Sequence, residues 1–267
     1  MAVEPGFCNY HTNFARHLGQ YRNVKLTVVG SSPAWPNPGG AQSGYLIEGP
    51  GRLLLDCGPG VLARLRERYA DNGWPRIDAI VVTHFHLDHW GDLVPWVWGL
   101  MVGPAREEDP PELWVPPSGR DELRALGTRL GMPDMFETTF SLREYRESEP
   151  FHAAGLEVRA LRLPHYTLET YGFRVTNGAR SLAYSGDSGP SERLAELARG
   201  CDLFLCEATL ERGELDGEPR GHLSVDEALD AFRASGAGRL ILTHRPHELP
   251  VDNGLELAYD GLQVDLS

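Results

Sequence analysis

The chain has 267 residues, 41% of them hydrophobic and 24% charged, which is ordinary for a globular protein. This length allows one large α/β domain or two small ones, with ample residues for a core. The formal net charge of −13 disfavours a long nucleic acid as partner, because affinity for a phosphate backbone comes mainly from Lys and Arg. Bound metal cations would reverse the sign locally, so small anionic substrates stay open.

The sequence indicates neither membrane insertion nor secretion. No window approaches 18 consecutive apolar residues, and the polar first residues lack the apolar stretch of a secretion signal. The cysteines form no CxxC pair and are expected to be thiols in a reducing cytosol: Cys8, Cys57, Cys201 and Cys206. We therefore expect a cytoplasmic protein with an N-terminal extension over 1–22 and one folded domain over 23–267.

The first half of the chain predicts strands followed by alternating strands and helices. A Pro/Gly/Ser loop over 31–44 follows the first strand, and a turn over 49–51 joins the next two into a hairpin. The periodicity of the apolar residues predicts strands over 24–30, 45–49, 52–58, 77–84 and 112–117, and helices over 61–69, 92–101 and 119–130.

The second half repeats this pattern. Residues 171–187 predict a hairpin around Asn177-Gly178, a strong turn signal, and Ser224 with Glu227 forms a capping box. Further strands are expected over 156–165, 201–209 and 238–244, helices over 191–199 and 224–234, and a polar loop over 211–221. This order of elements predicts an α/β fold in which two mixed sheets pack face to face with helices outside.

The stretch VVTHFHLDHWGD is the most informative in the chain. His84 and His86 point the same way at a strand end, because side chains alternate, and a turn brings Asp88 and His89 to the neighbouring side. Imidazole and carboxylate are good ligands for zinc and other first-row dications. At this spacing the four side chains cannot all bind one ion comfortably, but they can divide between two ions. The alternative, a solvated polar loop, is disfavoured because an aliphatic strand runs directly into the cluster.

Three downstream residues supply further candidate ligands, each just past a predicted strand: His165, Asp187 and His244. Taken singly, a strand-end histidine is more often a surface residue, and an Asp among small residues is often only a turn former. Ligand sites in α/β folds concentrate at the carboxyl ends of strands. All three together, in a chain that already holds HxHxDH, therefore indicate one metal site.

These residues, in this order, resemble the metallo-β-lactamase superfamily from about residue 24 to 243 and beyond. The resemblance implies an αββα sandwich with a dinuclear site in the groove between the sheets. It implies a first metal on His84, His86 and His165, a second on Asp88, His89 and His244, and Asp187 as the bridge. Asp56 matches an aspartate that supports the site from behind the ligands. Zinc is the expected metal, and manganese or iron would satisfy the same ligands.

Glu207 in FLCEAT and His222 in GHLS resemble a pair found in the phosphodiesterase branch of that superfamily, which includes ribonuclease Z. There the His lies near the leaving group and the Glu orients it. Two metals about 3.5–4 Å apart would clamp a phosphate and activate a bridging hydroxide, and His222 would protonate the leaving alkoxide. The plain alternative is a buried Glu salt bridge with a helix-cap histidine. The predicted catalytic residues are Asp88, Glu207 and His222.

The substrate is expected to be small. Ribonuclease Z carries a long arm for transfer RNA between the matches of His165 and Asp187, and here these residues are only 22 apart. The phrases SGYLIE, LAYSGDSG, LARGCDLFLCEA and GHLS resemble small actinobacterial-type enzymes of this superfamily that act on cyclic nucleotides. Hydrolysis of a small cyclic or nucleotide-type phosphodiester is therefore the leading hypothesis. The alternatives are a ribonuclease Z-like endonuclease, a carboxylic-ester, lactone or thioester hydrolase, and a metal- or nucleotide-binding protein without turnover.

Some features have no assigned place in this pattern. We expect core packing for most of Trp90, Trp96 and Trp98, although one of them could stack on a base. Proline- and charge-rich loops over 103–151 could shape the pocket. The apolar helix over 93–101 could belong to the core or to a homodimer face. Four histidines match no ligand position and are expected at the surface: His11, His17, His152 and His247.

Overall fold

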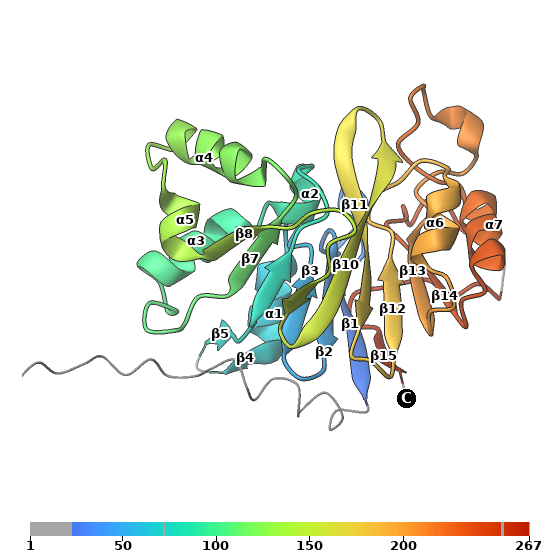
Figure 1. Ribbon diagram of the computed structural model, residues 1–267. Helices are drawn as coiled ribbons and strands as arrows, with labels where there is room; N and C mark the ends of the chain where they lie inside the picture. The colour runs from blue at the N-terminus through green and yellow to red at the C-terminus, as the bar shows by residue number, and fades with distance from the viewer. Residues whose placement is uncertain (1–22, 72, 252–253, 267) are drawn as a thin grey trace, which may run out of the picture.

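The computed structural model describes residues 23–71, 73–251 and 254–266, so the extension predicted over 1–22 lies outside the described residues. Two β-sheets pack face to face between two groups of helices (Figure 1). This is the αββα sandwich that the order of elements predicts. A two-stranded ribbon, β4 (Ala70–Asp71) and β5 (Trp74–Pro75), is attached beside the first sheet.

The first sheet has seven strands in the order β15-β1-β2-β3-β6-β7-β8. Strands β1 to β3 are antiparallel, with Tyr45 opposite Leu55 in the predicted hairpin, and β3, β6, β7 and β8 run parallel. The bounds are β1 (Val24–Gly30), β2 (Gly44–Glu48), β3 (Arg52–Leu55), β6 (Ala79–Val81), β7 (Glu112–Val115), β8 (Ser141–Glu144) and β15 (Gln263–Leu266).

The second sheet has six strands in the order β14-β13-β12-β11-β10-β9. A long hairpin pairs β10 with β11, and the turn at Asn177-Gly178 joins β11 to β12 as predicted. Strands β12, β13 and β14 are parallel. The bounds are β9 (Phe151–Ala153), β10 (Leu156–His165), β11 (Leu168–Thr176), β12 (Ser181–Tyr184), β13 (Leu203–Glu207) and β14 (Leu240–Thr243).

Helices cover the outer face of each sheet (Figure 1). The helix predicted over 92–101 is preceded by a separate single turn that carries Asp88 and His89. Ser224 and Glu227 form the predicted capping box of α7. The bounds are α1 (Val61–Tyr69), α2 (Leu87–Trp90), α3 (Leu93–Met101), α4 (Gly119–Arg129) and α5 (Met135–Thr139) on the first sheet, and α6 (Glu192–Leu197) and α7 (Val225–Ser235) on the second.

The apolar core has three layers. Inward-facing residues of both sheets fill the space between them. One outer cluster lies under the helices of the first sheet, and another lies under the helices of the second sheet. Trp90 and Trp96 are buried in the outer cluster of the first sheet, which agrees with the core role expected for them. Trp98 is 42% exposed on the opposite face of α3. Within the stretch over 103–151, β7 and α4 are the predicted strand and helix, and α5 and β8 are further elements at the edge of that sheet.

Several other expectations concern exposure. Cys57, Cys201 and Cys206 are buried free thiols, and Cys8 lies outside the described residues. His152 and His247 are exposed as predicted, whereas His11 and His17 also fall outside the described part. No helix in the described part of the chain is long and apolar enough to cross a membrane.

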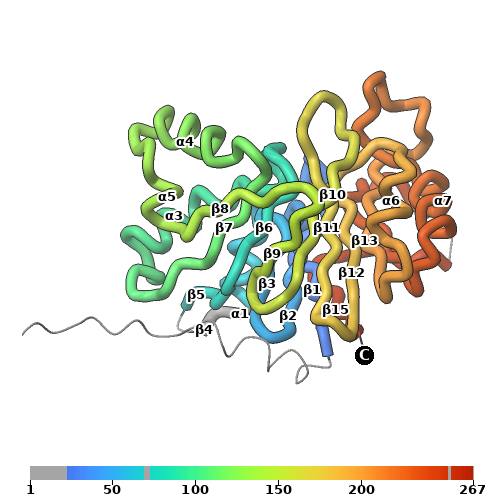
Figure 2. Tube along the Cα trace, viewed as in Figure 1, coloured from blue at the N-terminus to red at the C-terminus, as the bar shows by residue number. Residues whose placement is uncertain are grey.

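Six strands end at one edge of the sandwich, where α2 and the β10–β11 turn also lie (Figures 1 and 2). Strands β3 and β6 are parallel, β12 to β14 are parallel, and β10 shares their direction because β11 is antiparallel to both β10 and β12. The residues that follow these strand ends therefore meet in space. They include the candidate ligands that the sequence singled out, together with Asp56 after β3 and Glu207 at the end of β13.

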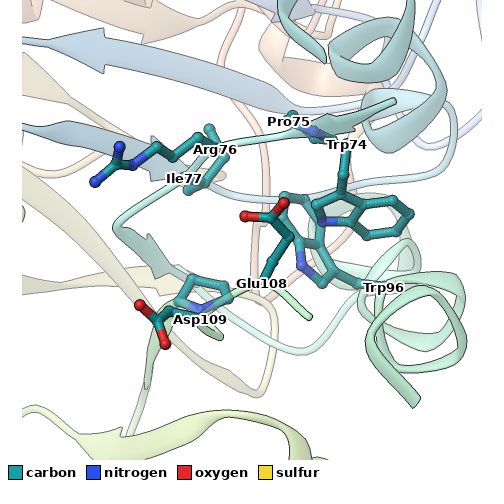
Figure 3. A pocket seen from close by; sticks show the side chains of 8 residues that line it. Trp74, Pro75, Arg76, Ile77, Trp96, Glu108 and Asp109 are labelled. Carbon is teal, nitrogen blue, oxygen red and sulfur yellow. The ribbon is translucent and has the colours of Figure 1, made fainter. Parts of the chain in front are cut away.

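A small cavity of about 150 Å³ lies away from that edge (Figure 3). Trp74 and Trp96 meet edge-to-face in its wall, with ring centroids 5.7 Å apart. Ile77 lines it just before β6, whereas His84 lies just after β6. None of the predicted ligands lines this cavity.

Candidate metal centre

Three sets of side chains at the shared edge could each hold a metal ion. Glu207, His222 and His244 form one of them, and the two that share Asp187 are the candidate metal groups. The ligand atoms within each group lie within 4.8 Å of one another. The first group is His84, His86, His165 and Asp187, and the second is Asp88, His89, Asp187 and His244. All seven residues predicted from the sequence are brought together. They divide as the family resemblance implies, with Asp187 common to both groups.

The first group is assembled from both sheets. His84 and His86 follow β6, and His165 ends β10. The His165 Nε2 atom lies 2.9 Å from His86 Nδ1 and 3.9 Å from Asp187 Oδ2, and His84 Nε2 lies 3.8 Å from Asp187 Oδ2. Three imidazole nitrogens and one carboxylate oxygen thus converge, which is a donor set suited to a first-row dication.

The second group lies on the other side of Asp187. His89 Nε2 is 3.2 Å from Asp187 Oδ1 and 3.3 Å from Asp88 Oδ2. His244 Nε2 is 3.0 Å from Asp88 Oδ2 and 3.5 Å from Asp187 Oδ1. The two oxygens of Asp187 therefore face different groups, so this carboxylate could contribute to both.

The burial of these atoms tests whether a cation fits. His84 Nε2, His89 Nε2 and Asp187 Oδ1 are buried and have no hydrogen-bond partner among the described residues. Buried polar atoms without a partner are costly and rare, so their convergence needs a compensating ligand. Nitrogen and carboxylate donors in this arrangement suit a divalent cation. The cluster is therefore suited to metal binding.

A buried carboxylate supports the side of the first sheet. Asp56 follows β3, and its Oδ2 accepts hydrogen bonds from His89 Nδ1 at 2.7 Å, Tyr184 Oη at 2.8 Å and Thr83 Oγ1 at 3.0 Å, while its Oδ1 accepts from Thr83 N at 2.8 Å. Because the Thr83 hydroxyl donates to Asp56, it can accept from His84 Nδ1 at 2.9 Å. These bonds orient the Nε2 atoms of both histidines toward the metal groups.

A second carboxylate supports the opposite side. Glu207 ends β13, and its Oε2 accepts from Thr209 Oγ1 at 2.8 Å. The Thr209 hydroxyl can then accept from His244 Nδ1 at 2.9 Å, which leaves His244 Nε2 free to bind a metal. Glu207 Oε1 accepts from His222 Nδ1 at 3.0 Å. One carboxylate therefore holds a candidate ligand through a threonine and holds His222 directly.

His222 lies between the two metal groups. It precedes Ser224, the N-cap of α7, and its ring is 5.0 Å from the His165 ring and 5.7 Å from the His244 ring. Burial lowers the pKa of His222, but the charge of Glu207 and the hydrogen bond to it outweigh burial and raise the pKa to about 9. The imidazole is thus held protonated at neutral pH, as a proton donor must be.

The other histidines differ in charge. Burial lowers the pKa of His84, His86 and His165, so these rings are neutral, which is the form that coordinates a metal. Burial also opposes the charge on His89, but the carboxylates of Asp187, Asp56 and Asp88 raise its pKa well above the usual range. The three histidines of the first group are therefore neutral donors, and the second group is rich in carboxylate charge.

Three supporting residues were missed in the sequence: Thr83, Thr209 and Tyr184. A threonine beside a histidine or a glutamate has no distinctive spacing, and strand positions are rich in threonine and tyrosine anyway. Backbone conformation is a further mark of the site. Asp56, Tyr166 and His244 have φ values of 57°, 48° and 54°, which non-glycine residues rarely adopt and which cluster at functional sites.

The αββα fold with two His/Asp groups at the shared edge defines a metallo-hydrolase of the β-lactamase fold. A family model described as "Beta-lactamase superfamily domain" matches residues 51–245, and the chain belongs to this family. An uncharacterized protein of Mycobacterium tuberculosis, Rv1339, is 35% identical over 233 residues, covering 85% of this chain and 83% of its own length. The probable metallo-hydrolase YhfI of Bacillus subtilis is 29% identical over 84% of this chain and 88% of its own.

A ribonuclease Z of Mycolicibacterium paratuberculosis is 27% identical, over 83% of this chain and 85% of its own. Solved structures show the same fold. The crystal structure of Bacillus subtilis YhfI aligns with a TM-score of 0.76 and 24% identity over 91% of this chain and 99% of that chain. A diphosphatase from the PhnP family aligns with a TM-score of 0.71 and 22% identity over 90% and 97%. The predicted superfamily is thus confirmed.

Proposed function

We propose that the protein is a dinuclear metal-dependent phosphodiesterase that hydrolyses a small cyclic or nucleotide-type phosphodiester. The observation that carries this proposal is the His222 ring, which the buried Glu207 carboxylate holds at Nδ1 beside both candidate metal groups. A thioester expels a thiolate, which is a better leaving group and depends less on such a donor. A phosphodiester expels a basic alkoxide, which benefits strongly from protonation.

Each group of the site has a place in this reaction. When bound, two cations would neutralise the phosphate charge and make water acidic enough to supply a nucleophile at neutral pH. The ligands on that assignment are His84, His86 and His165 for one ion, Asp88, His89 and His244 for the other, and Asp187 for both. Zinc is our expectation for both positions. His222 Nε2 would give its proton to the leaving oxygen, while Glu207 holds the ring at Nδ1 and stabilises the imidazolium.

The connection between His165 and Asp187 favours a small substrate. Residues 166–186 are used by the tight β10–β11 turn, by β11, and by the turn into β12, so they offer no protruding arm. The net charge of −13 also disfavours a long RNA. Relatives named ribonuclease Z and a structural neighbour named as a diphosphatase are consistent with chemistry at phosphorus.

A hydrolysis panel tests the proposal. The metal-loaded protein is assayed with bis-p-nitrophenyl phosphate, 3′,5′-cyclic AMP, a 2′,3′-cyclic nucleotide, precursor transfer RNA, a lactone and a thioester. Wild type is compared with Asp88→Ala, which loses a ligand, and with His222→Ala, which loses the donor. We expect diester turnover in wild type and none in Asp88→Ala. His222→Ala should lose about 10²–10⁴-fold on the alkyl diesters and much less on p-nitrophenyl leaving groups.

The other outcomes select other functions. Lactone or thioester turnover without diester turnover, unchanged in His222→Ala, would assign a carboxylic-ester hydrolase on the same fold. Preferential cleavage of precursor transfer RNA would assign a ribonuclease Z-like endonuclease. Nucleotide binding without any turnover would assign a binding protein.

A further inference from the structure

Tyr166 occupies a position that the proposed reaction has not used. It forms the β10–β11 turn directly after His165, and it is 40% exposed at the edge where the metal groups lie. Its ring centroid is 4.9 Å from the His165 ring and 5.6 Å from the His222 ring. A partly exposed aromatic ring thus stands beside both a candidate metal ligand and the candidate proton donor.

The ring lies on Gly221, next to His222 in the chain. A Cβ atom at Gly221 would lie 2.3 to 2.5 Å from three adjacent atoms of the Tyr166 ring. Nearly equal distances to adjacent atoms place that Cβ over the face of the ring and not at its rim. The missing side chain at Gly221 therefore lets the tyrosine lie flat on the loop that carries His222, with the backbone covering one face.

The surrounding bonds fix this ring in place. Tyr166 adopts a φ of 48°, which is strained for a bulky residue, and its N–H donates to the Arg220 carbonyl at 3.1 Å. Its hydroxyl interacts with the carboxylate of Asp216, and burial together with this carboxylate raises the pKa of Tyr166. Asp216 Oδ2 accepts from the backbone N–H groups of Gly221 and His222 at 2.7 and 3.0 Å. A ring held this firmly and yet partly exposed is a preorganised surface for a ligand.

We propose that Tyr166 determines specificity by forming one wall of the subsite for the organic group on the leaving-group side of the phosphate, and that this wall takes a nucleoside ring. This rests on the proposed function, because His222 marks the leaving-group side. Aromatic rings stack on the flat faces of nucleobases and pack against ribose. Tyr166 is a contact residue in this role, and its effect falls on binding of the ring and not on the chemical step.

The test is a ladder of competitive inhibitors that share the phosphate and differ in what is attached to it. Inorganic phosphate, ribose 5-phosphate and adenosine 5′-monophosphate compete with bis-p-nitrophenyl phosphate for the metal-loaded protein. Tyr166→Leu should raise the inhibition constant of the nucleotide about tenfold and leave that of phosphate unchanged. Tyr166→Phe keeps the ring and should match wild type. Trp98→Leu, at a ring of similar exposure on α3, is the matched control.

The outcomes are distinct. A change confined to the nucleotide assigns the wall to the base, and a change shared with ribose 5-phosphate assigns it to the sugar. An unchanged nucleotide constant, or an equal change for all three ligands, overturns the proposal. If Tyr166→Leu fails to fold or to bind metal, intermolecular NOEs between the nucleotide and the Tyr166 ring in wild type test the proposal instead. The absence of these NOEs overturns the proposal. A wild type without diester turnover refutes the proposed function, and calorimetric binding of the same ligands still tests Tyr166.

Discussion

The two halves of the sandwich support their candidate metal ligands in the same way but use the supporting carboxylate differently. On the first sheet Asp56 holds His89 directly and can hold His84 through Thr83. On the second sheet Glu207 holds His222 directly and can hold His244 through Thr209. Both carboxylates are fully buried, but Asp56 supports two predicted ligands, whereas Glu207 supports one predicted ligand and His222, which is in neither group that contains Asp187.

We therefore expect Asp56 to act mainly on structure and Glu207 to act mainly on the reaction. All partners of Asp56 belong to the buried interior, so its loss would disturb folding and metal binding together. Glu207 connects a metal ligand to the candidate proton donor, so its loss would act first on chemistry.

Asp56→Asn should have the largest effect on stability. Asn accepts at one oxygen only and leaves His89, Thr83 or Tyr184 without an acceptor, which costs about 1–3 kcal/mol for each unsatisfied group. Metal affinity should fall about 10–100-fold, as for other residues that orient a ligand. Urea unfolding and metal titration measure both effects. Glu207→Gln should lower metal affinity less, because Asp56 supports two predicted ligands and Glu207 supports one, and an equal loss of metal affinity would contradict the proposed division of roles.

Glu207→Gln should shift the pH dependence of diester hydrolysis. His222 must be protonated to act as a donor, and its pKa is about 9 because the charge of Glu207 outweighs burial. Activity should therefore fall as pH rises through about 9 in wild type. Removing the carboxylate charge lets burial lower the pKa, so this alkaline limb moves to lower pH by about 1–3 units. Glu211→Gln, on the exposed loop, is the control. If the alkaline limb lies at the same pH in Glu207→Gln and Glu211→Gln, His222 is not the group that titrates in that limb.

Thr209→Val and Thr83→Val test the two hydroxyl links separately. Each change keeps the shape and removes the hydroxyl between a carboxylate and a histidine. We expect metal affinity to fall about tenfold in either variant, measured by competition with a chelator. Ser restores the hydroxyl and should restore affinity. If Thr209→Val and Thr209→Ser lowered metal affinity equally, loss of the hydroxyl would not be the cause, and the proposed link through Thr209 would be wrong.

Asp92→Asn should have the smallest effect. Asp92 Oδ2 accepts from Leu62 N at 2.8 Å, and burial raises its pKa from 3.8 to about 6 despite backbone hydrogen bonds. The folded protein then binds this proton more tightly than the unfolded chain, so the free energy of unfolding falls as pH rises from about 4 to about 6. Asn keeps an acceptor and removes the charge, so stability should become flatter across that range. Urea unfolding at several pH values would show an unchanged slope if Asp92 were not the cause.

The sequence located the candidate ligands better than the residues that support them. His84, His86, Asp88 and His89 lie within one short segment, and His165, Asp187 and His244 each follow a strand whose end the alternation of apolar residues locates. The supporting threonines depend on contacts across the fold, which no local pattern encodes. The edge strands β8, β9 and β15 were missed because they are short and half polar; β15 has alternating exposed and buried residues over only four positions. Tyr166 lies in a turn, where a tyrosine carries no signal.

The distribution of tryptophan gives the two halves different optical signals. All six tryptophans lie between residues 35 and 114, in the half built on the first sheet. Trp74, Trp90 and Trp96 are buried in its outer cluster. Intrinsic tryptophan emission therefore follows this half alone, while the tyrosine absorbance of Tyr171 and Tyr184 includes the second sheet. If the two signals of the metal-free protein change at different urea concentrations, its two halves unfold separately. The metal centre would then be what holds them together.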